Sequence, residues 1–171
     1  MDKLILVKPA AEHKQAALEL KQEFNYANSN MNGSIGFQRY DNYEEWLDVL
    51  EKSRKGAVSK LRVPSSTYFG VYNNKIVGTI NIRHKLDKEL LHIGGHIGYS
   101  VRPSERRKGY ATEMLALALD KCRKLNIKKA LLTCLKENTA SARTIIKSGG
   151  ILENEVVSND GKPVQRYWID L

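Results

Sequence analysis

At 171 residues and 19.4 kDa the chain has the size of a domain that buries a core without disulfides or a structural metal, and we expect a single domain over residues 1–171. Its composition, 42% hydrophobic and 27% charged, is that of a globular protein, and no apolar run approaches the roughly 20 residues of a membrane-spanning helix. The formal net charge of +9 invites an anionic partner, but the lysines and arginines are scattered without interleaved aromatic residues, which disfavours general nucleic-acid binding.

Apolar residues recur along the chain with the periods of helices and strands. In chain order they predict a strand at 4–8, a helix at 11–24, a long polar loop at 25–42, a helix from 43 to 50, strands at 67–72, 76–83 and 91–101, a helix at 111–125, a strand at 129–135, a short helix at 140–147, and a final hairpin of strands at 151–157 and 164–169. The order β-α-α-β-β-β-α-β-α-β-β predicts an α/β fold of the α+β kind, a mixed, mainly antiparallel sheet flanked by helices with one βαβ unit in it. The long loop has a length typical of functional loops.

The beginning of the chain predicts a cytoplasmic protein. The apolar stretch at residues 4–7 ends at Lys8-Pro9 and is too short for a signal sequence. The two cysteines, Cys122 and Cys134, stand apart, and we expect both to be reduced and buried in the core.

The segment at residues 95–112 has the pattern of a phosphate-binding turn. A strand runs into the basic run Arg106-Arg107-Lys108, after which Gly109 opens a helix. The first amides of a helix have no partner within the helix, and its dipole favours an anion there. The small residues Gly109 and Ala111 leave room for a phosphate. The pattern fits either a diphosphate site or a basic turn whose small residues allow close helix packing.

This segment resembles a family motif. Arg106-x-x-Gly109-x-Ala111, following Val101-x-Pro103, is similar to the acetyl-CoA pyrophosphate loop of the GNAT N-acetyltransferase superfamily. The segments Asn138-Thr139-Ala140-Ser141-Ala142-Arg143 and Lys147-Ser148-Gly149-Gly150 are similar to the second conserved segment of that superfamily. Residues 95–103 and 166–169 resemble a group of uncharacterised bacterial acetyltransferases. The element order fits as well, so the resemblance spans essentially the whole chain and implies a GNAT fold.

The resemblance implies a cosubstrate, acetyl-CoA, and the residues that bind it. The amides of residues 107–112 would hold the pyrophosphate, the main chain of residues 99–101 would pair with the pantetheine arm like an added strand, and Asn138 and Ser141 would contact the pantetheine or adenosine end. Asn138 also fits a plain helix N-cap. The implied binding residues are Tyr99, Ser100, Val101, Arg106, Arg107, Lys108, Gly109, Tyr110, Ala111, Thr112, Asn138 and Ser141.

The activity implied is transfer of an acetyl group to a primary amine by direct attack in a ternary complex. The amine must first lose a proton. Many family members use a Glu on the fourth strand as the base, and His96 takes that position here, so His96 is the leading candidate; a water-mediated base, no dedicated base and a structural histidine are the alternatives. The resemblance assigns the oxyanion donor to the backbone N–H of Val101.

The position of the family's proton-donating Tyr is taken by Ile145, which has no proton to give. Cys134 and Tyr110 are further candidates near the thioester. Because both family positions differ, a GNAT-like module that binds CoA without turnover remains an alternative, as does a basic RNA-binding protein. A homodimer is compatible with the sequence.

No metal site is expected. His92 and His96 fall on one face of the predicted strand but about 13 Å apart, which is too far for two ligands of one zinc. By analogy with the family, the first two helices, the loop between them, the third strand and the last hairpin bound the acceptor site. The residues there are Phe24, Tyr26, Arg39, Tyr40, Asp41, Tyr43, Trp46, Asn81, Arg83 and Arg166, and Trp46 also fits the core. The candidate acceptors are a peptide α-amine, an amino acid, a polyamine or an aminosugar.

Overall fold

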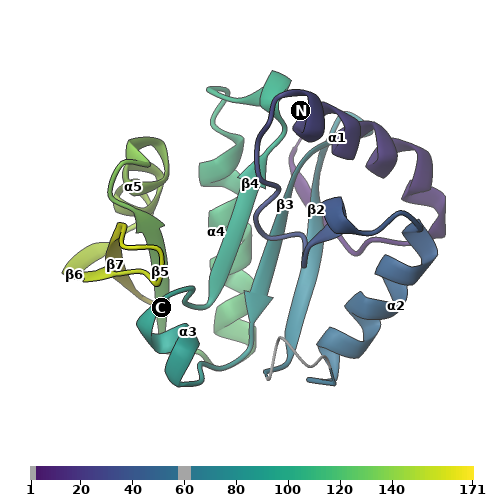
Figure 1. The fold of residues 1–171 in the computed structure, drawn as a ribbon. Coiled ribbons are helices and arrows are strands. Elements are labelled where there is room, and N and C mark those ends of the chain that lie inside the picture. Colours follow the sequence, from purple (N-terminus) through teal and green to yellow (C-terminus); the bar gives the residue numbers. More distant parts are fainter. Residues whose placement is uncertain (1–2, 58–62) are drawn as a thin grey trace.

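The computed structural model describes residues 3–57 and 63–171 and has helices packed on two antiparallel sheets (Figure 1). Its elements are β1 (Ile5–Val7), α1 (Lys14–Tyr26), α2 (Tyr43–Arg54), β2 (Ser65–Tyr72), β3 (Lys75–Arg83), α3 (Lys88–His92), β4 (Ile97–Val101), α4 (Tyr110–Lys124), β5 (Lys129–Leu135), α5 (Thr139–Lys147), β6 (Ile151–Val157) and β7 (Pro163–Asp170), with 3-10 turns at Ala11–His13, Phe37–Arg39 and Pro103–Glu105.

The strands form a four-stranded sheet in the order β1-β2-β3-β4 and a three-stranded sheet in the order β5-β7-β6, and every pairing is antiparallel. The predicted fold of antiparallel strands flanked by helices is therefore confirmed. The predicted single sheet is divided between β4 and β5. The segment just before β4 contacts β5 through an isolated bridge between Gly95 and Leu132 and through the hydrogen bond from the His96 amide to the Leu131 carbonyl.

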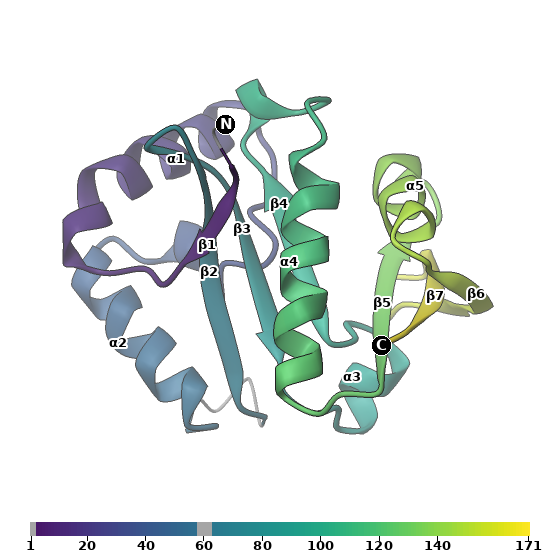
Figure 2. The same ribbon diagram turned by 180° about the vertical axis from the view of Figure 1, so that it is seen from behind.

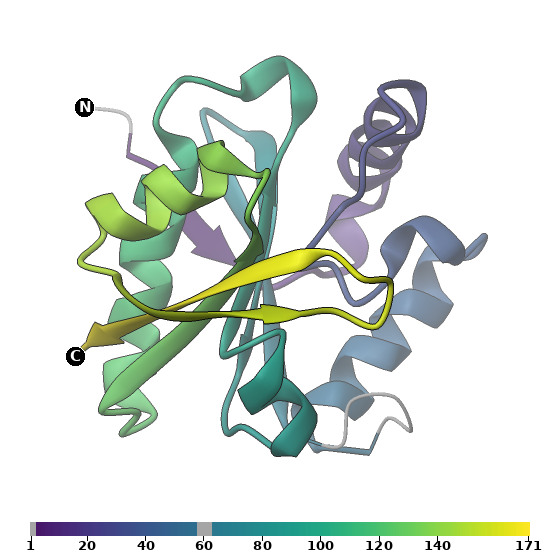
Figure 3. The same ribbon diagram turned by 60° about the vertical axis from the view of Figure 1, so that its left-hand side comes forward.

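Helices cover both faces of the four-stranded sheet (Figure 3). One face carries α1 and α2, and the other carries α4, which runs along β3 and β4 beside α5 and the second sheet (Figure 2). The alternation of β3 serves both layers: Ile80 and Ile82 pack into the core beneath α4, whereas Thr79 bonds the loop after α1. A second apolar cluster, built around Phe24, lies between α1, α2 and the sheet.

The predicted strand at residues 91–101 is wrong in its first half. The side chain of Asp87 accepts a hydrogen bond from the amide of Leu90 and caps α3, so the chain is helical through His92. Gly94 and Gly95 follow with φ of +114° and +63°, which interrupt an extended backbone, and β4 begins at Ile97. His92 therefore lies on a helix, and the strand spacing between His92 and His96 does not apply.

The remaining predicted elements are confirmed with small shifts at their ends. The Asn73-Asn74 turn takes positive φ at both residues, 47° and 59°, as a tight hairpin turn of the I′ kind requires. Cys122 and Cys134 are buried, as expected for core residues.

Candidate active site

One edge of β4 has no strand beside it. The carbonyl of His96 accepts a hydrogen bond from β3, and the amide of Arg102 donates one to β3. Because successive peptide groups of a strand point to opposite sides, the main chain of Ser100 also faces β3, whereas that of Tyr99 and Val101 faces the opposite edge. In the described chain that edge lies at the end of its sheet, and it opens toward β5. It has unpaired groups to offer an extended ligand.

The turn after β4 presents a row of free amides. Arg107 and Gly109 have φ of +64° and +87°, and this left-handed backbone turns the chain into α4. The amides of residues 107–111 donate no hydrogen bond to any described residue. A Cβ added at Gly109 would have nothing within 4 Å, so a bulky anion has space in front of the turn. Free amides at a helix N-terminus suit a phosphate group, and the turn leaves them available to one.

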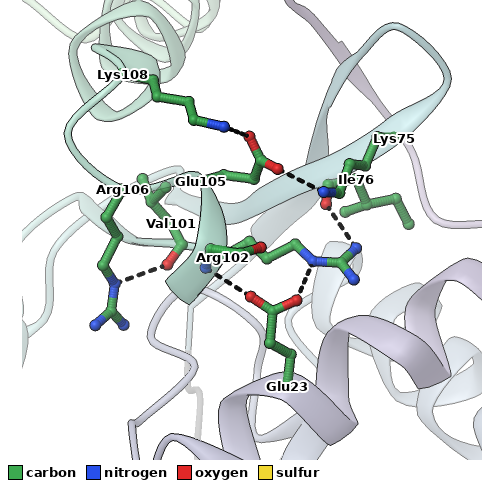
Figure 4. Close-up of polar contacts among 9 residues, drawn as sticks. Glu23, Lys75, Ile76, Val101, Arg102, Glu105, Arg106 and Lys108 are labelled. Atoms are coloured by element: carbon green, nitrogen blue, oxygen red, sulfur yellow. Dashed lines mark hydrogen bonds and ion pairs between the residues drawn. The ribbon is translucent and has the colours of Figure 1, made fainter.

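The basic residues of this turn have different surroundings (Figure 4). The carboxylate of Glu105 binds two ammonium groups, that of Lys75 at 2.5 Å and that of Lys108 at 2.7 Å. Arg106 points away from the amides and donates to the carbonyl of Val101 (3.2 Å) and the hydroxyl of Ser29 (2.8 Å). Among the three basic residues predicted to face an anion, Arg107 alone has a side chain without a partner among the described residues.

Glu23 fixes this turn to helix α1 (Figure 4). One carboxylate oxygen accepts from the guanidinium of Arg102 at 2.5 Å, and the other accepts from the amide of Ser104 at 2.6 Å. Burial works to raise the pKa of Glu23, but the hydrogen bonds from Ser104 and Arg102 outweigh it and hold the pKa below its usual range. The carboxylate is therefore charged at neutral pH and holds the end of β4 against α1.

Two hydroxyl groups meet across the separation between β4 and α5. The hydroxyl of Tyr99 lies 3.0 Å from that of Ser141, and burial raises the pKa of Tyr99. The side chain of Asn138 accepts from the amide of Ser141 at 3.1 Å, so Asn138 is the N-cap of α5. This pair of hydroxyls was not foreseen from the sequence, because it depends on how far apart β4 and α5 lie.

The contacts of His96 favour a structural role over catalysis. Its Nδ1 accepts a hydrogen bond from the amide of Leu131 at 2.9 Å, and its own amide donates to the carbonyl of Leu131 at 2.7 Å. Burial, with the charge of Arg83, lowers the pKa of His96 from 6.5 to about 4, so the ring is neutral at pH 7. With Nδ1 accepting, the neutral ring carries its proton on Nε2 and has no lone pair free to take a proton from an amine.

Ile145 is a core residue. It is fully buried on α5 in the cluster beneath α4, and a Cβ added at Gly150 would come within 2.5 Å of its Cγ2. The alternative expectation, that Ile145 lies at the leaving sulfur, is not supported by this packing.

We therefore expect Ile145→Tyr to lower the free energy of unfolding by about 1–3 kcal/mol, because an added ring overpacks a filled core. The matched control is Ile146→Tyr at the neighbouring position, which is 55% exposed and should stay within about 0.5 kcal/mol of the parent. Denaturant unfolding of the two variants measures both values. Equal stabilities would place Ile145 outside the core.

A pocket of about 560 Å³ lies on the α1–α2 side of the sheet. The loop after α1 crosses over β3 and β4 (Figure 1), where the carbonyl of Asn32 accepts from Thr79 at 2.9 Å and from Ser100 at 2.8 Å. Gly33 packs on the backbone of Gly98 so closely that a Cβ there would lie 2.3 Å from the Gly98 oxygen. The pocket is lined by residues 30–36 and by Gln38, Arg39, Asn81 and Arg83.

Three of the predicted acceptor residues, Arg39, Asn81 and Arg83, line this pocket. Others are elsewhere: Phe24, Tyr43 and Trp46 are buried in the second apolar cluster, and Tyr26 is 96% exposed. Trp46 donates to the carbonyl of Ser34 at 2.7 Å and so supports the loop from below.

Three further predicted acceptor residues lie off the pocket lining. Tyr40 and Asp41 are outside it, and Asp41 is exposed. Arg166 is bound to Glu153, to Asn154 and to the carbonyl of Leu91, which ties β7 to α3.

Within residues 3–57 and 63–171 no cluster of three or more His, Cys, Asp or Glu side chains has the arrangement of a metal site. No helix in the described chain is long and apolar enough to span a membrane.

The free edge of β4, the amide-lined turn and the pocket over β3 are the candidate binding surfaces of this protein. A model of the Acetyltransferase (GNAT) family matches residues 20–149, and the chain belongs to this family. It is an acetyl-CoA-dependent N-acetyltransferase. No curated protein sequence matches the chain.

Solved structures share the fold at low identity. Microcin C7 self immunity acetyltransferase MccE, in complex with acetyl-CoA and AMP, is 18% identical with a TM-score of 0.71, and the match covers 100% of this chain and 94% of that one. The ribosomal L7/L12 α-N-protein acetyltransferase RimL with coenzyme A is 17% identical with a TM-score of 0.71 over 98% and 94%. Mycobacterium smegmatis RimJ with CoA-disulfide is 18% identical with a TM-score of 0.74 over 98% and 81%.

Proposed function

We propose that this enzyme transfers the acetyl group of acetyl-CoA to a primary amine, an α-amine in particular, by direct attack in a ternary complex. The observation that carries the proposal is the position of the free edge of β4. This edge continues at one end into the amide-lined turn, and the pocket over β3 is bounded by the loop that contacts Gly98 and Ser100 of β4. A cosubstrate bound along the edge would present its thioester to an amine held in the pocket.

The cosubstrate would be held mainly by backbone groups. The amides of residues 107–111 suit the pyrophosphate, and the unpaired groups of Tyr99 and Val101 suit the pantetheine amides in the manner of an added strand. The carbonyl of Val101 is bonded to Arg106, but its amide is free. That amide is the donor we assign to the developing oxyanion.

We assign the protonation of the departing thiolate to the hydroxyl pair of Tyr99 and Ser141. Tyr99 belongs to the strand whose free edge would hold the pantetheine, and its phenol is protonated at neutral pH because burial keeps its pKa above the ordinary value of 10. The proton can therefore pass only to a strongly basic group such as a desolvated thiolate. The Ser141 hydroxyl, 3.0 Å away, orients it. In this proposal the phenol of Tyr99 is the proton donor, since Ile145 lies in the core and has no proton to give.

The pocket supports an amine that reaches the site already neutral. None of the described residues that line it is Asp or Glu, and His96 has no free lone pair. Without a protein base, the neutral fraction of the amine sets the rate. At pH 7 that fraction is about 10% for an α-amine of pKa near 8 but only about 0.04% for a lysine amine of pKa near 10.4. This difference favours an α-amine, with water taking the proton.

We expect His96→Gln to keep kcat/KM within a few-fold of the parent, because Gln also offers an oxygen to the Leu131 amide. In both proteins kcat/KM should rise with pH up to the pKa of the amine, about tenfold per unit. Thiol release from acetyl-CoA with an N-terminally free peptide measures the profile. A loss of about 10²-fold with unchanged acetyl-CoA binding would restore His96 as the base.

The same variant has a second readout in stability. The folded protein holds His96 neutral down to about pH 4, whereas the unfolded chain takes up a proton below 6.5. Between these values the unfolded state binds more protons, so the parent should lose about 3 kcal/mol more than His96→Gln as pH falls through this window. If acetyl-CoA binds but no thiol is released with any acceptor tested, the protein is instead a module that binds CoA without turnover.

We also propose a cytoplasmic location, where acetyl-CoA is made and used. Two free buried cysteines, Cys122 and Cys134, are compatible with a reducing compartment.

A further inference from the structure

We propose that the pocket over β3 recognises an oxyacid anion, a carboxylate or a phosphate, carried by the amine acceptor. Arg83 would bind the anion, Arg39 would add charge at the rim, and Asn81 would lie beside the amine. The inference rests on the proposed function and narrows its acceptor to an amine that bears a negative charge. Three observations support it: an arginine without an acid partner, its place beside β4, and the composition of the pocket.

Arg83 is a desolvated cation without a carboxylate. Its Nη1 donates to the carbonyls of Gly94 (3.0 Å) and Gly95 (3.1 Å), and its Nε is buried without a partner. Burial lowers its pKa. No Asp or Glu of the described chain forms an ion pair with it.

Two other buried arginines in the same protein are neutralised. Arg102 pairs with Glu23 and Arg166 pairs with Glu153. Leaving a desolvated charge unpaired is unfavourable, which is why buried ions in proteins are generally paired. An anionic ligand would supply at Arg83 the partner that the chain itself provides at the other two sites.

The guanidinium of Arg83 lies beside the reacting strand. A Cβ built at Gly98 of β4 would lie 3.6 Å from its Nη2 and 3.8 Å from its Nη1. Gly98 comes just before Tyr99, whose main chain forms part of the free edge. Because Arg83 also lines the pocket, an acceptor whose anionic group binds Arg83 would hold its amine, only a few covalent bonds away, close to β4.

Asn81 provides a matching polar group. It is fully buried, and one end of its amide is bonded to the hydroxyl of Thr67 at 3.0 Å while Oδ1 has no partner. An unsatisfied buried acceptor is unfavourable unless a ligand donates to it, and an amine N–H does so. Asn81 and Arg83 are two residues apart on one face of β3, about 7 Å, so a small acceptor reaches both.

The composition of the pocket disfavours a polycation such as a polyamine. Its charged lining residues are Arg39 and Arg83, both positive, and the rest are polar amides, a serine, glycines and two apolar side chains. A polyamine would need carboxylates to replace the water it loses, and the described lining has none.

The first experiment compares matched acceptors with the parent enzyme. Thiol release is followed for alanine against alaninamide, for the dipeptide amide Ala-Asp against Ala-Asn, and for Ala-phosphoserine against Ala-Ser. We expect kcat/KM at least tenfold higher for the charged member of at least one pair, and the pair that shows it tells carboxylate from phosphate. Equal values within all three pairs would overturn the anion proposal while leaving the transferase proposal intact; no turnover with any acceptor would overturn both.

The second experiment locates the preference in the pocket. In Arg83→Met and in Arg39→Gln the ratio between charged and neutral acceptors should fall toward one, more strongly for Arg83. The side chain of Arg39 is exposed at the rim and forms no hydrogen bond or ion pair with a described residue, so Arg39→Gln remains informative where Arg83→Met does not fold. Arg123→Gln is the control, because Arg123 pairs with Asp120 on the outside of α4. A ratio that survives both pocket substitutions would contradict the assignment.

Discussion

Gly109→Glu should abolish most of the stabilisation that acetyl-CoA gives to the protein. The new carboxylate would lie at the row of free amides of residues 107–111, where it competes with the pyrophosphate and repels it. At a ligand concentration of about 100 Kd the parent gains about 2.7 kcal/mol, and a thermal-shift titration with acetyl-CoA measures how much of this gain remains.

The control for this experiment is Gly161→Glu in the turn between β6 and β7. Gly109 and Gly161 have similar φ values, +87° and +80°, and neither has an atom within 4 Å of an added Cβ. Both substitutions should therefore destabilise the free protein by about 1–2 kcal/mol through left-handed backbone strain. Gly161→Glu alone should keep the full response to acetyl-CoA. A retained response in Gly109→Glu would refute the assignment of the turn.

Tyr99→Phe should lower kcat by about 10²-fold at neutral pH, with little change in the KM for acetyl-CoA. The substitution removes only the hydroxyl that we assign to protonation of the departing thiolate, and the ring that packs against the core is kept. Ser141→Ala should have a smaller effect, because it removes the partner that orients the phenol at 3.0 Å. Steady-state thiol release measures both variants.

Tyr43→Phe is the control for Tyr99→Phe, because it also removes a buried phenol hydroxyl but one that has no assigned part in the reaction. Tyr43 is fully buried. Its hydroxyl donates a hydrogen bond to the carbonyl of Ala10 at 2.9 Å, away from the edge of β4. This variant should lose about 1 kcal/mol of stability and keep its turnover. If Tyr99→Phe lost stability in the same way but kept kcat, the phenol would be structural.

Local sequence predicted what depends on local rules. The helix after Gly109 and the strands of the final hairpin were predicted because their apolar residues recur with the periods of helices and strands. The strand before Ile97 was wrong because the cap at Asp87 and the two left-handed glycines outweighed an apolar run. The hydrophobic pattern of the sequence did not show that a helix capped by Asp87 would form in place of the strand.

The candidate site was predictable from the sequence only where it is made of backbone groups. The amide-lined turn follows from Gly109 and the start of α4, and its position was predicted. The roles of side chains depend on tertiary contacts: Lys108 is held by Glu105, His96 by Leu131, and Ile145 by the core. The sequence also could not show that Arg83 lacks an acidic partner. Segments far apart in the chain form the pocket around Arg83, and none of the described lining residues is Asp or Glu.

The attachment of the turn to α1 has a consequence for cooperativity. Glu23 accepts hydrogen bonds from Ser104 and Arg102, and Ser29 accepts one from Arg106. The turn to which we assign the pyrophosphate is therefore bonded to the end of α1 that leads into the pocket loop at residues 30–36. If acetyl-CoA shifts this turn when it binds, we expect the pocket loop that would receive the acceptor to shift with it. Binding of the two ligands would then be coupled. Because linkage is reciprocal, the factor by which the acceptor raises the affinity for acetyl-CoA equals the factor by which acetyl-CoA raises the affinity for the acceptor.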